Sequence, residues 1–146
     1  EGNITLVERI KDLFKTSNGK YIAPQQIEIK LGTSKYVDQA AVIGDQRNYV
    51  TAIIVPALPE VEKLAAERNI RYKLIDELLT HPDIIAFYQS LIDSLQQEMA
   101  SYEKVKKFTL IKKGFTIESG EMTSTLKLRR AVIMQNYRKL IDEMYK

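Results

Sequence analysis

The chain contains no cysteine, a single histidine and no long apolar run. Without thiols it can form no disulfide, thiolate metal site or cysteine nucleophile, which fits a reducing compartment, so we expect a cytoplasmic location. No stretch approaches the roughly 18 apolar residues of a membrane-spanning helix. His81, which Pro82 follows, lacks the partners of a metal site or a catalytic triad. We therefore assign it to a helix boundary and expect no metal site.

The rest of the composition is that of one ordinary globular domain, with 45% hydrophobic and 28% charged residues in 146. A net charge of +3 and a pI near 9.0 permit an anionic partner without naming one. Basic residues gather at 104–113 and 127–138, but the aromatic residues there alternate with core positions and offer no stacking platform for bases. We interpret these charges mainly as solvated and expect no nucleic-acid partner. A small basic RNA-binding module is the alternative from another class.

Periodicity predicts an α+β fold. Alternating residues at 4–8 and 13–16 predict a short N-terminal hairpin, with 9–12 in its connection. Three further strands and several helices would form a small, mainly antiparallel sheet covered by helices. The strands are expected at 37–43, 49–55 and 107–110, and the helices from Pro24 to Gly32, near 61–69, around 74–79, from Pro82 to about Met99, and from about Leu128. The chain begins without an initiator methionine or a signal-peptide pattern, which we interpret as a piece of a longer protein.

A polar, hydroxyl-rich stretch at residues 119–130 surrounds Lys127 and leads into the expected last helix. It has little apolar bulk, so we expect it not to pack and to hold the lysine at the tip of a mobile segment. A lysine ammonium is a point charge for phosphate or carboxylate oxygens, and a helix start adds N–H donors. From the residues alone, two interpretations remain: an anion-binding loop of low specificity, or a solvated loop with an N-capping threonine.

The order Thr-Ser-Thr-Leu-Lys-Leu-Arg-Arg at 123–130 resembles the C-terminal signature of long-chain acyl-CoA synthetases in the adenylate-forming superfamily. Residues 9–28 resemble the linker signature of that family, and residues 102–108 also share in the resemblance. The resemblance implies a mobile C-terminal lid at 17–146, preceded by a hinge-proximal hairpin at 1–16. The main partner would be the large N-terminal domain of the same polypeptide. Peripheral membrane association would depend on the full-length protein.

The resemblance also implies the reaction: ATP and a fatty acid give acyl-AMP and pyrophosphate, and coenzyme A then accepts the acyl group. Lys127 would be catalytic in the first step, and Lys11 would be the hinge about which the domain rotates. Arg9 and Lys20 would contact the nucleotide. Mg²⁺ would be bound mainly by the N-terminal domain. Because the chain has no glycine-rich ATP phosphate loop and no fatty-acyl pocket sequence, we expect it to be inactive alone.

The turn-forming residues 16–20 would by themselves indicate an ordinary hairpin tip, with Gly19 permitting positive φ. In the family, this loop lines the tunnel for the pantetheine arm, which assigns Ser17, Asn18 and Gly19 to that role. Relatives commonly carry Gly-Gly at 18–19 and proline where Ser124 stands. Asparagine tolerates left-handed backbone, so we expect the loop shape to be kept. A fatty acyl-AMP ligase that delivers to a carrier protein would use the same loop and is the closest alternative.

Overall fold

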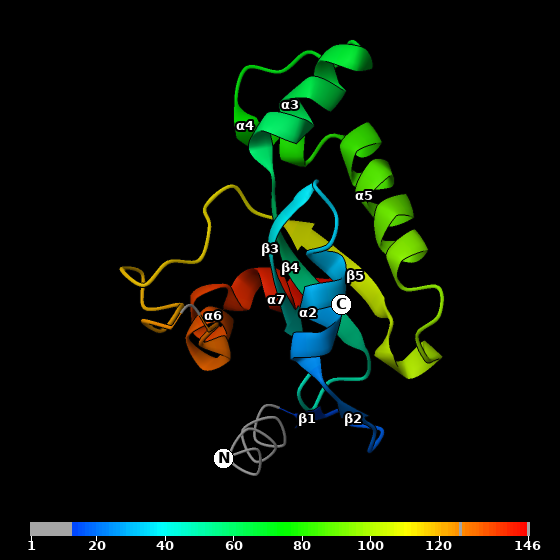
Figure 1. The fold of residues 1–146 in the computed structure, drawn as a ribbon, viewed down its shortest axis with the longest axis vertical. Helices are drawn as coiled ribbons and strands as arrows, with labels where there is room; N and C mark the ends of the chain where they lie inside the picture. The colour runs from blue at the N-terminus through cyan, green and yellow to red at the C-terminus, as the bar shows by residue number, and fades with distance from the viewer. Residues whose placement is uncertain (1–12, 126, 146) are drawn as a thin grey trace.

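The computed structural model describes residues 13–125 and 127–145. A two-stranded hairpin precedes a separate three-stranded sheet that helices cover, so the predicted α+β fold is confirmed (Figure 1). The strands are β1 (Phe14–Lys15), β2 (Tyr21–Ile22), β3 (Val37–Ile43), β4 (Val50–Pro56) and β5 (Val105–Leu110). The helices are α2 (Pro24–Leu31), α3 (Leu58–Glu67), α4 (Ile75–Leu79), α5 (Pro82–Leu95), α6 (Arg130–Asn136) and α7 (Arg138–Met144), with a 3₁₀ turn at Ser101–Glu103.

The sheet has the strand order β3–β4–β5 and mixes the two pairing directions. β3 and β4 pair antiparallel through a short turn, whereas β5 runs parallel to β4. Parallel neighbours need a long crossover, and α3, α4 and α5 supply it. The three expected strands are therefore present, and one of the two pairings in the sheet is parallel.

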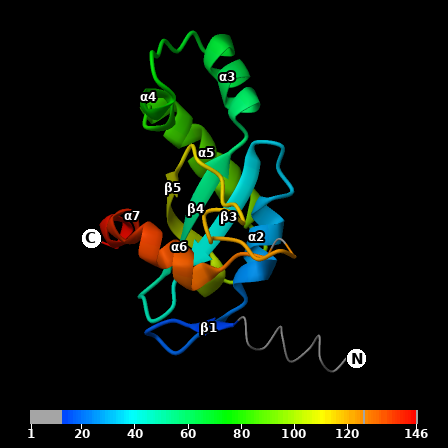
Figure 2. The same ribbon diagram turned by 90° about the vertical axis from the view of Figure 1, so that its left-hand side faces the viewer.

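Helices lie on both sides of the sheet (Figure 2), and two apolar clusters fill the space between them and its two faces. Alternate strand residues point to opposite faces, so β4 faces apolar neighbours on both sides, and this explains its mainly apolar sequence, in which Thr51 is the one polar residue. One cluster packs against α2 and α5 and the other against α6 and α7. In the three-stranded sheet, the strand residues of the first are Val37, Ala40, Val42, Val50, Ala52, Ile54 and Val105, and those of the second are Ala41, Ile43, Ile53 and Val55.

The first hairpin differs from the expected one. The strand predicted at 13–16 is present at Phe14–Lys15, but its partner is Tyr21–Ile22, with Phe14 opposite Ile22. Gly19 has a φ of 84°, and the Thr16 N–H donates to the Lys20 carbonyl at 2.9 Å, which closes a tight turn. The expected partner at 4–8 and connection at 9–12 lie outside the described residues.

His81 lies at the start of α5, and the predicted boundary role is confirmed. Its Nδ1 accepts a hydrogen bond from the Asp83 N–H at 3.1 Å, which caps the helix. The helix ends at Leu95, earlier than expected. Gln96 is buried, and its side chain accepts from the Val105 N–H at 2.8 Å and donates to the Val105 carbonyl at 3.1 Å. This buried amide joins the end of the helix to the start of β5.

The expectation of one last helix beginning near Leu128 is wrong. Leu128 forms an isolated antiparallel bridge with Met122, and α6 starts only at Arg130. The helical stretch is then interrupted at Tyr137, where α6 ends and α7 begins. The change of direction lets α6 contact β3 while α7 contacts β4 and β5. A 3.6-residue apolar period continues across such a break, so the pattern alone does not reveal it.

Candidate functional sites

Lys127 lies just before α6, in a loop whose backbone is hydrogen-bonded on both sides. The Thr123 N–H donates to the Lys127 carbonyl at 2.8 Å, and the Lys127 N–H donates to the Thr123 hydroxyl at 3.2 Å. The Arg129 N–H donates to the Glu121 carbonyl at 2.7 Å. The Lys127 side chain itself is exposed. The structure thus places an exposed lysine on a hydrogen-bonded backbone, and Lys127 is not part of a helical first turn.

The loop packs more firmly than its polar composition predicts, and Glu121 is the reason. This residue is only 3% exposed. Its carboxylate accepts from the Ser119 hydroxyl at 2.8 Å and from the Asn136 side-chain amide at 3.1 Å. Met122 beside it packs against the apolar cluster on that face of the sheet. The expectation of a loop that does not pack is therefore wrong, because a buried carboxylate rather than apolar bulk anchors it.

Arg130 forms an ion pair with Glu28 of α2, and our interpretation of its charge as solvated is wrong. The side chains are only 19% and 12% exposed, respectively. Arg130 Nη1 donates to Glu28 Oε2 and, at 3.0 Å, to the Val42 carbonyl. A weak sequence signal existed, since Glu28 directly follows Ile27, which is buried on α2. Which of 22 lysines and arginines pairs with it depends on the tertiary structure.

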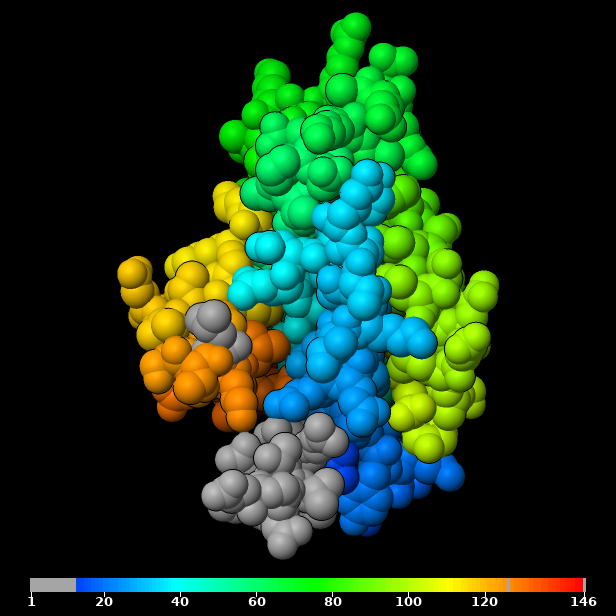
Figure 3. Space-filling model, in the orientation of Figure 1, coloured from blue at the N-terminus to red at the C-terminus, as the bar shows by residue number. Residues whose placement is uncertain are grey.

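Lys127 opens onto a shallow hollow of about 300 Å³ between its loop and α2. The lining residues are Gln25, Glu28, Ile29, Lys127, Leu128 and Arg130. In Figure 3 the orange segment of this loop lies beside the blue α2 on one face of the molecule. An ammonium offers donors and no acceptor, so it suits carboxylate or phosphate oxygens.

The other predicted site residues that the structure describes lie at the tip of the β1–β2 hairpin, which rests on the β3–β4 turn. The Ser17 N–H donates to the Arg47 carbonyl at 2.9 Å, and the Ser17 hydroxyl donates to Asn48 Oδ1 at 2.8 Å. The Asn18 side-chain amide donates to the Asn48 carbonyl at 3.1 Å. Gly19 takes the predicted positive φ. No sequence pattern indicated that Asn48 supports this tip.

A second hollow of about 210 Å³ lies beside the hairpin tip and shares no lining residue with the first. It is lined by Thr16, Asn18, Lys20, Asn48, Tyr49, Ser101, Tyr102 and Lys106. Lys20 Nζ lies 5.4 Å from the centre of the Tyr102 ring. The structure therefore brings Asn18 and Lys20 together and keeps Lys127 at a different hollow. Arg9 and Lys11 lie outside the described residues.

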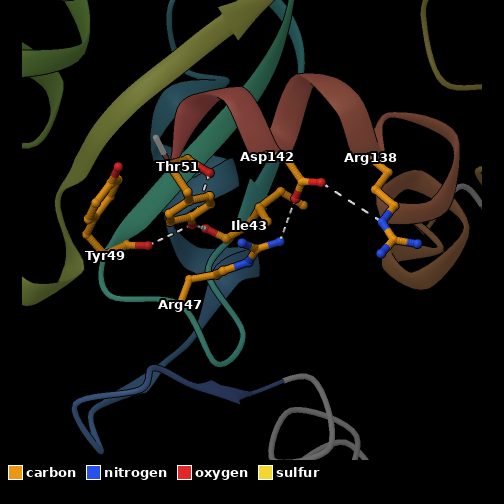
Figure 4. Close-up of polar contacts among 7 residues, drawn as sticks. Ile43, Arg47, Tyr49, Thr51, Arg138 and Asp142 are labelled. Carbon is orange, nitrogen blue, oxygen red and sulfur yellow. Dashed lines mark hydrogen bonds and ion pairs between the residues drawn. The ribbon is translucent and has the colours of Figure 1, made fainter.

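The C-terminal helix anchors the β3–β4 turn (Figure 4). Arg47 Nη2 donates to Asp142 at 3.0 Å, and the guanidinium lies 4.7 Å from the centre of the Tyr145 ring. The Tyr145 hydroxyl donates to the Tyr49 carbonyl at 2.7 Å and accepts from the Thr51 hydroxyl at 3.2 Å. Burial raises the pKa of the Tyr145 hydroxyl, and the Thr51 hydrogen bond and the Arg47 charge partly offset this effect.

Within residues 13–125 and 127–145, no three His, Cys, Asp or Glu side chains come close enough together to hold a metal ion. The same residues contain no helix that is both long and apolar enough to span a membrane.

Comparison with known families and proteins gives a consistent result. The family described as "AMP-binding enzyme C-terminal domain" matches residues 11–146. The chain is 32% identical over 147 residues to the peroxisomal long chain acyl-CoA synthetase 7 of Arabidopsis thaliana, and the match covers 99% of the chain and 21% of that protein. It is 29% identical to the long-chain-fatty-acid–CoA ligase FadD15 of Mycobacterium tuberculosis, covering 24% of it. The chain therefore spans about a fifth to a quarter of these relatives.

Solved structures with the same fold include adenylation domains. The adenylation domain of a carboxylate reductase from Mycobacterium chelonae superposes with a TM-score of 0.74 at 26% identity, over 94% of this chain and 20% of that one. The A-PCP didomain of a carboxylic acid reductase from Segniliparus rugosus, in complex with AMP, superposes with a TM-score of 0.72 at 25% identity, covering 92% and 17% of the two chains.

Proposed function

This chain belongs to the AMP-binding enzyme C-terminal domain family, and we propose that it is the lid of a long-chain fatty-acid–CoA ligase. The enzyme would convert ATP and a fatty acid to acyl-AMP and pyrophosphate, and then acyl-AMP and coenzyme A to acyl-CoA and AMP. Residues 1–16 would form the hinge-proximal segment and 17–146 the lid. The large N-terminal domain would bind ATP and the fatty acid and would supply most of the Mg²⁺ ligands.

The observation that carries this proposal is the exposed Lys127 ammonium on a hydrogen-bonded backbone at the first hollow. In the adenylation step a carboxylate must approach an anionic α-phosphate. An ammonium held between them offsets their repulsion and stabilises the charge that develops on the phosphoryl oxygens. Because the backbone is already held by hydrogen bonds, only the lysine side chain would lose conformational entropy when it engages the reacting groups.

The second half-reaction would use the separate hollow at the hairpin tip. Rotation about Lys11 would withdraw Lys127 and present Ser17, Asn18 and Gly19 to the pantetheine arm, with Arg9 and Lys20 as nucleotide contacts. Two observations support this division: the two hollows share no lining residue, and the Asn18 side chain is hydrogen-bonded to the Asn48 carbonyl. That bond holds the Asn18 side chain against the β3–β4 turn. Members of the family commonly have glycine in place of Asn18.

The test is Lys127→Ala in the full-length enzyme, with the exposed Lys139→Ala on α7 as the matched control. Loss of one preorganised contact of this kind lowers a rate by about 10²–10³-fold. We expect that loss in pyrophosphate release, whereas thioester formation from supplied acyl-AMP stays close to wild type. Lys139→Ala should leave both steps unchanged. Equal loss of both half-reactions in Lys127→Ala would contradict the proposal.

Delivery to a carrier protein is the second candidate, because the chain superposes on the A-PCP didomain of a carboxylic acid reductase. Supplying preformed acyl-AMP with either coenzyme A or a phosphopantetheinylated carrier protein separates the two acceptors. We expect coenzyme A to be the better acceptor for the full-length enzyme. A strong preference for the carrier protein would reverse this assignment.

The chain alone should make no acyl-CoA from ATP, fatty acid and coenzyme A. It should also show no salt-dependent association with generic RNA, which the RNA-binding alternative requires. Detectable turnover by the isolated chain would overturn the lid assignment. The compartment depends on the whole protein: a cytoplasmic location stays a prediction, and one relative is named as peroxisomal.

A further inference from the structure

The Glu28–Arg130 ion pair provides hydrogen-bond partners for the backbone of one residue on the edge strand of the three-stranded sheet. β3 is an edge strand of this sheet, and an edge residue presents backbone groups that need partners. The Val42 N–H donates to Glu28 Oε2 at 2.8 Å, and the Val42 carbonyl accepts from Arg130 Nη1 at 3.0 Å. The two side chains therefore bind both backbone groups of one edge residue, as a neighbouring strand would.

Because both charged side chains are largely buried, the ion pair is stable only while they remain in contact. Glu28 and Arg130 are 12% and 19% exposed, so each charge has lost most of its water and depends on its partner. Arg130 uses both terminal nitrogens toward the two carboxylate oxygens of Glu28, the second at 3.5 Å. Four groups from α2, β3 and α6 are thereby held together, and the start of α6 is fixed against the sheet.

The fixed helix start is close to Lys127. Arg130 follows Lys127 by three residues, and Glu28, Lys127 and Arg130 line the same hollow. On the other side of the lysine, the two hydrogen bonds with Thr123 hold the backbone. We propose that Glu28 and Arg130 form a positioning clamp that sets the origin of the Lys127 side chain for acyl-adenylate formation. This inference rests on the proposed function, and it assigns no contact with the substrate to either residue.

The clamp predicts a selective defect in the full-length enzyme. In Arg130→Met we expect adenylation to fall by about 10–100-fold, since a displacement on the order of 1 Å can cost that much. Thioester formation from supplied acyl-AMP should stay within about twofold of wild type. Glu28→Gln keeps an acceptor for the Val42 N–H but loses the charge, so its defect should have the same direction and be smaller. In the double variant the second change should add little, because both remove one interaction.

Two control variants separate a folding defect from a loss of positioning. Glu28→Gln/Arg130→Met leaves no unpaired buried charge, so it remains informative if Arg130→Met does not fold. Tyr88→Phe removes the hydroxyl that donates to the Tyr36 carbonyl at 2.7 Å, and neither residue lines the Lys127 hollow. It should lower stability and spare both half-reactions. A selective loss of adenylation in the clamp variants, absent in Tyr88→Phe, would support the proposal.

Two outcomes would refute the clamp: unchanged adenylation in a folded Glu28→Gln/Arg130→Met protein, or equal losses in the two half-reactions. Lys127→Ala in the same assay separates this failure from that of the proposed function. If Lys127→Ala slows adenylation and the clamp variants do not, only the clamp is wrong. If Lys127→Ala leaves adenylation intact, the proposed function is wrong and the clamp falls with it.

Discussion

Replacing Tyr145 by phenylalanine should destabilise the protein, because it removes one hydroxyl from the junction between the end of α7 and the sheet (Figure 4). That hydroxyl donates to the Tyr49 carbonyl at 2.7 Å and accepts from Thr51 at 3.2 Å. Thr51 is fully buried. The ring would keep its packing, so the substitution isolates the polar contribution.

The expected magnitude follows from the groups left without a partner. A buried polar group that loses its hydrogen bond costs about 1–3 kcal/mol, and the Thr51 hydroxyl lies in this class. Adding the weaker loss at the Tyr49 carbonyl, we expect a decrease of about 2–3 kcal/mol in the free energy of unfolding. Tyr49→Phe is the matched control, since its hydroxyl donates to the Met144 carbonyl at 2.7 Å at a helix end. Water can replace that bond, so the cost should be about 0.5–1 kcal/mol.

Urea unfolding followed by far-UV circular dichroism measures both variants at neutral pH. With an m-value of about 2 kcal/mol per molar urea, Tyr145→Phe should lower the midpoint by about 1 M. Tyr49→Phe should lower it by less than half as much, and neither change should alter the m-value. Equal shifts for the two variants, or no shift for Tyr145→Phe, would refute the assignment of this hydroxyl as a buried structural group.

Three further changes test other parts of the structure. Burial raises the pKa of Tyr88 above the ordinary 10.0, so the unfolded chain releases this proton first. The contribution of Tyr88 to the free energy of unfolding should therefore be constant below pH 10 and fall above it. Urea midpoints should show this alkaline loss, and Tyr88→Phe should reduce it. Gly44→Ala would place a Cβ 3.0 Å from the Phe14 ring, so thermal unfolding should show a loss of about 1–3 kcal/mol, and an unchanged melting temperature would contradict this steric argument. Asn48→Ala removes the acceptor of the Ser17 hydroxyl; on the proposed function it should raise the KM for coenzyme A severalfold and spare adenylation, and a purely adenylation defect would contradict the role given to the hairpin tip.

Local sequence predicted most of the elements because local physics determines them. The β-branched run at Val50–Pro56 is buried on both faces, and Pro24 and Gly32 flank the helix that was expected between them. The direction of β5 could not be predicted, because alternation along one strand does not show which way its neighbour runs. The break at Tyr137 was missed for a related reason, since the apolar period continues through it.

The candidate sites were predictable only where a motif carried them. Lys127 and the hairpin tip came from the resemblance, and the structure places them at two hollows. Their supports were not predictable, because Arg130 meets Glu28 from 102 positions away and Asn48 meets Ser17 from 31. Ion pairs and hydrogen bonds across such separations exist only once the sheet has assembled.

The crossover between β4 and β5 has a practical consequence for testing the proposed rotation of this domain. Residues 57–100 contribute no lining residue to the Lys127 hollow or to the hollow at the hairpin tip, and α3 and α4 lie at the opposite end of the molecule from the hairpin (Figure 1). A fluorophore on the exposed Lys73, between α3 and α4, would travel along a wide arc if the lid turns. Energy transfer from such a label to the N-terminal domain could therefore time the alternation between half-reactions without touching either reactive surface.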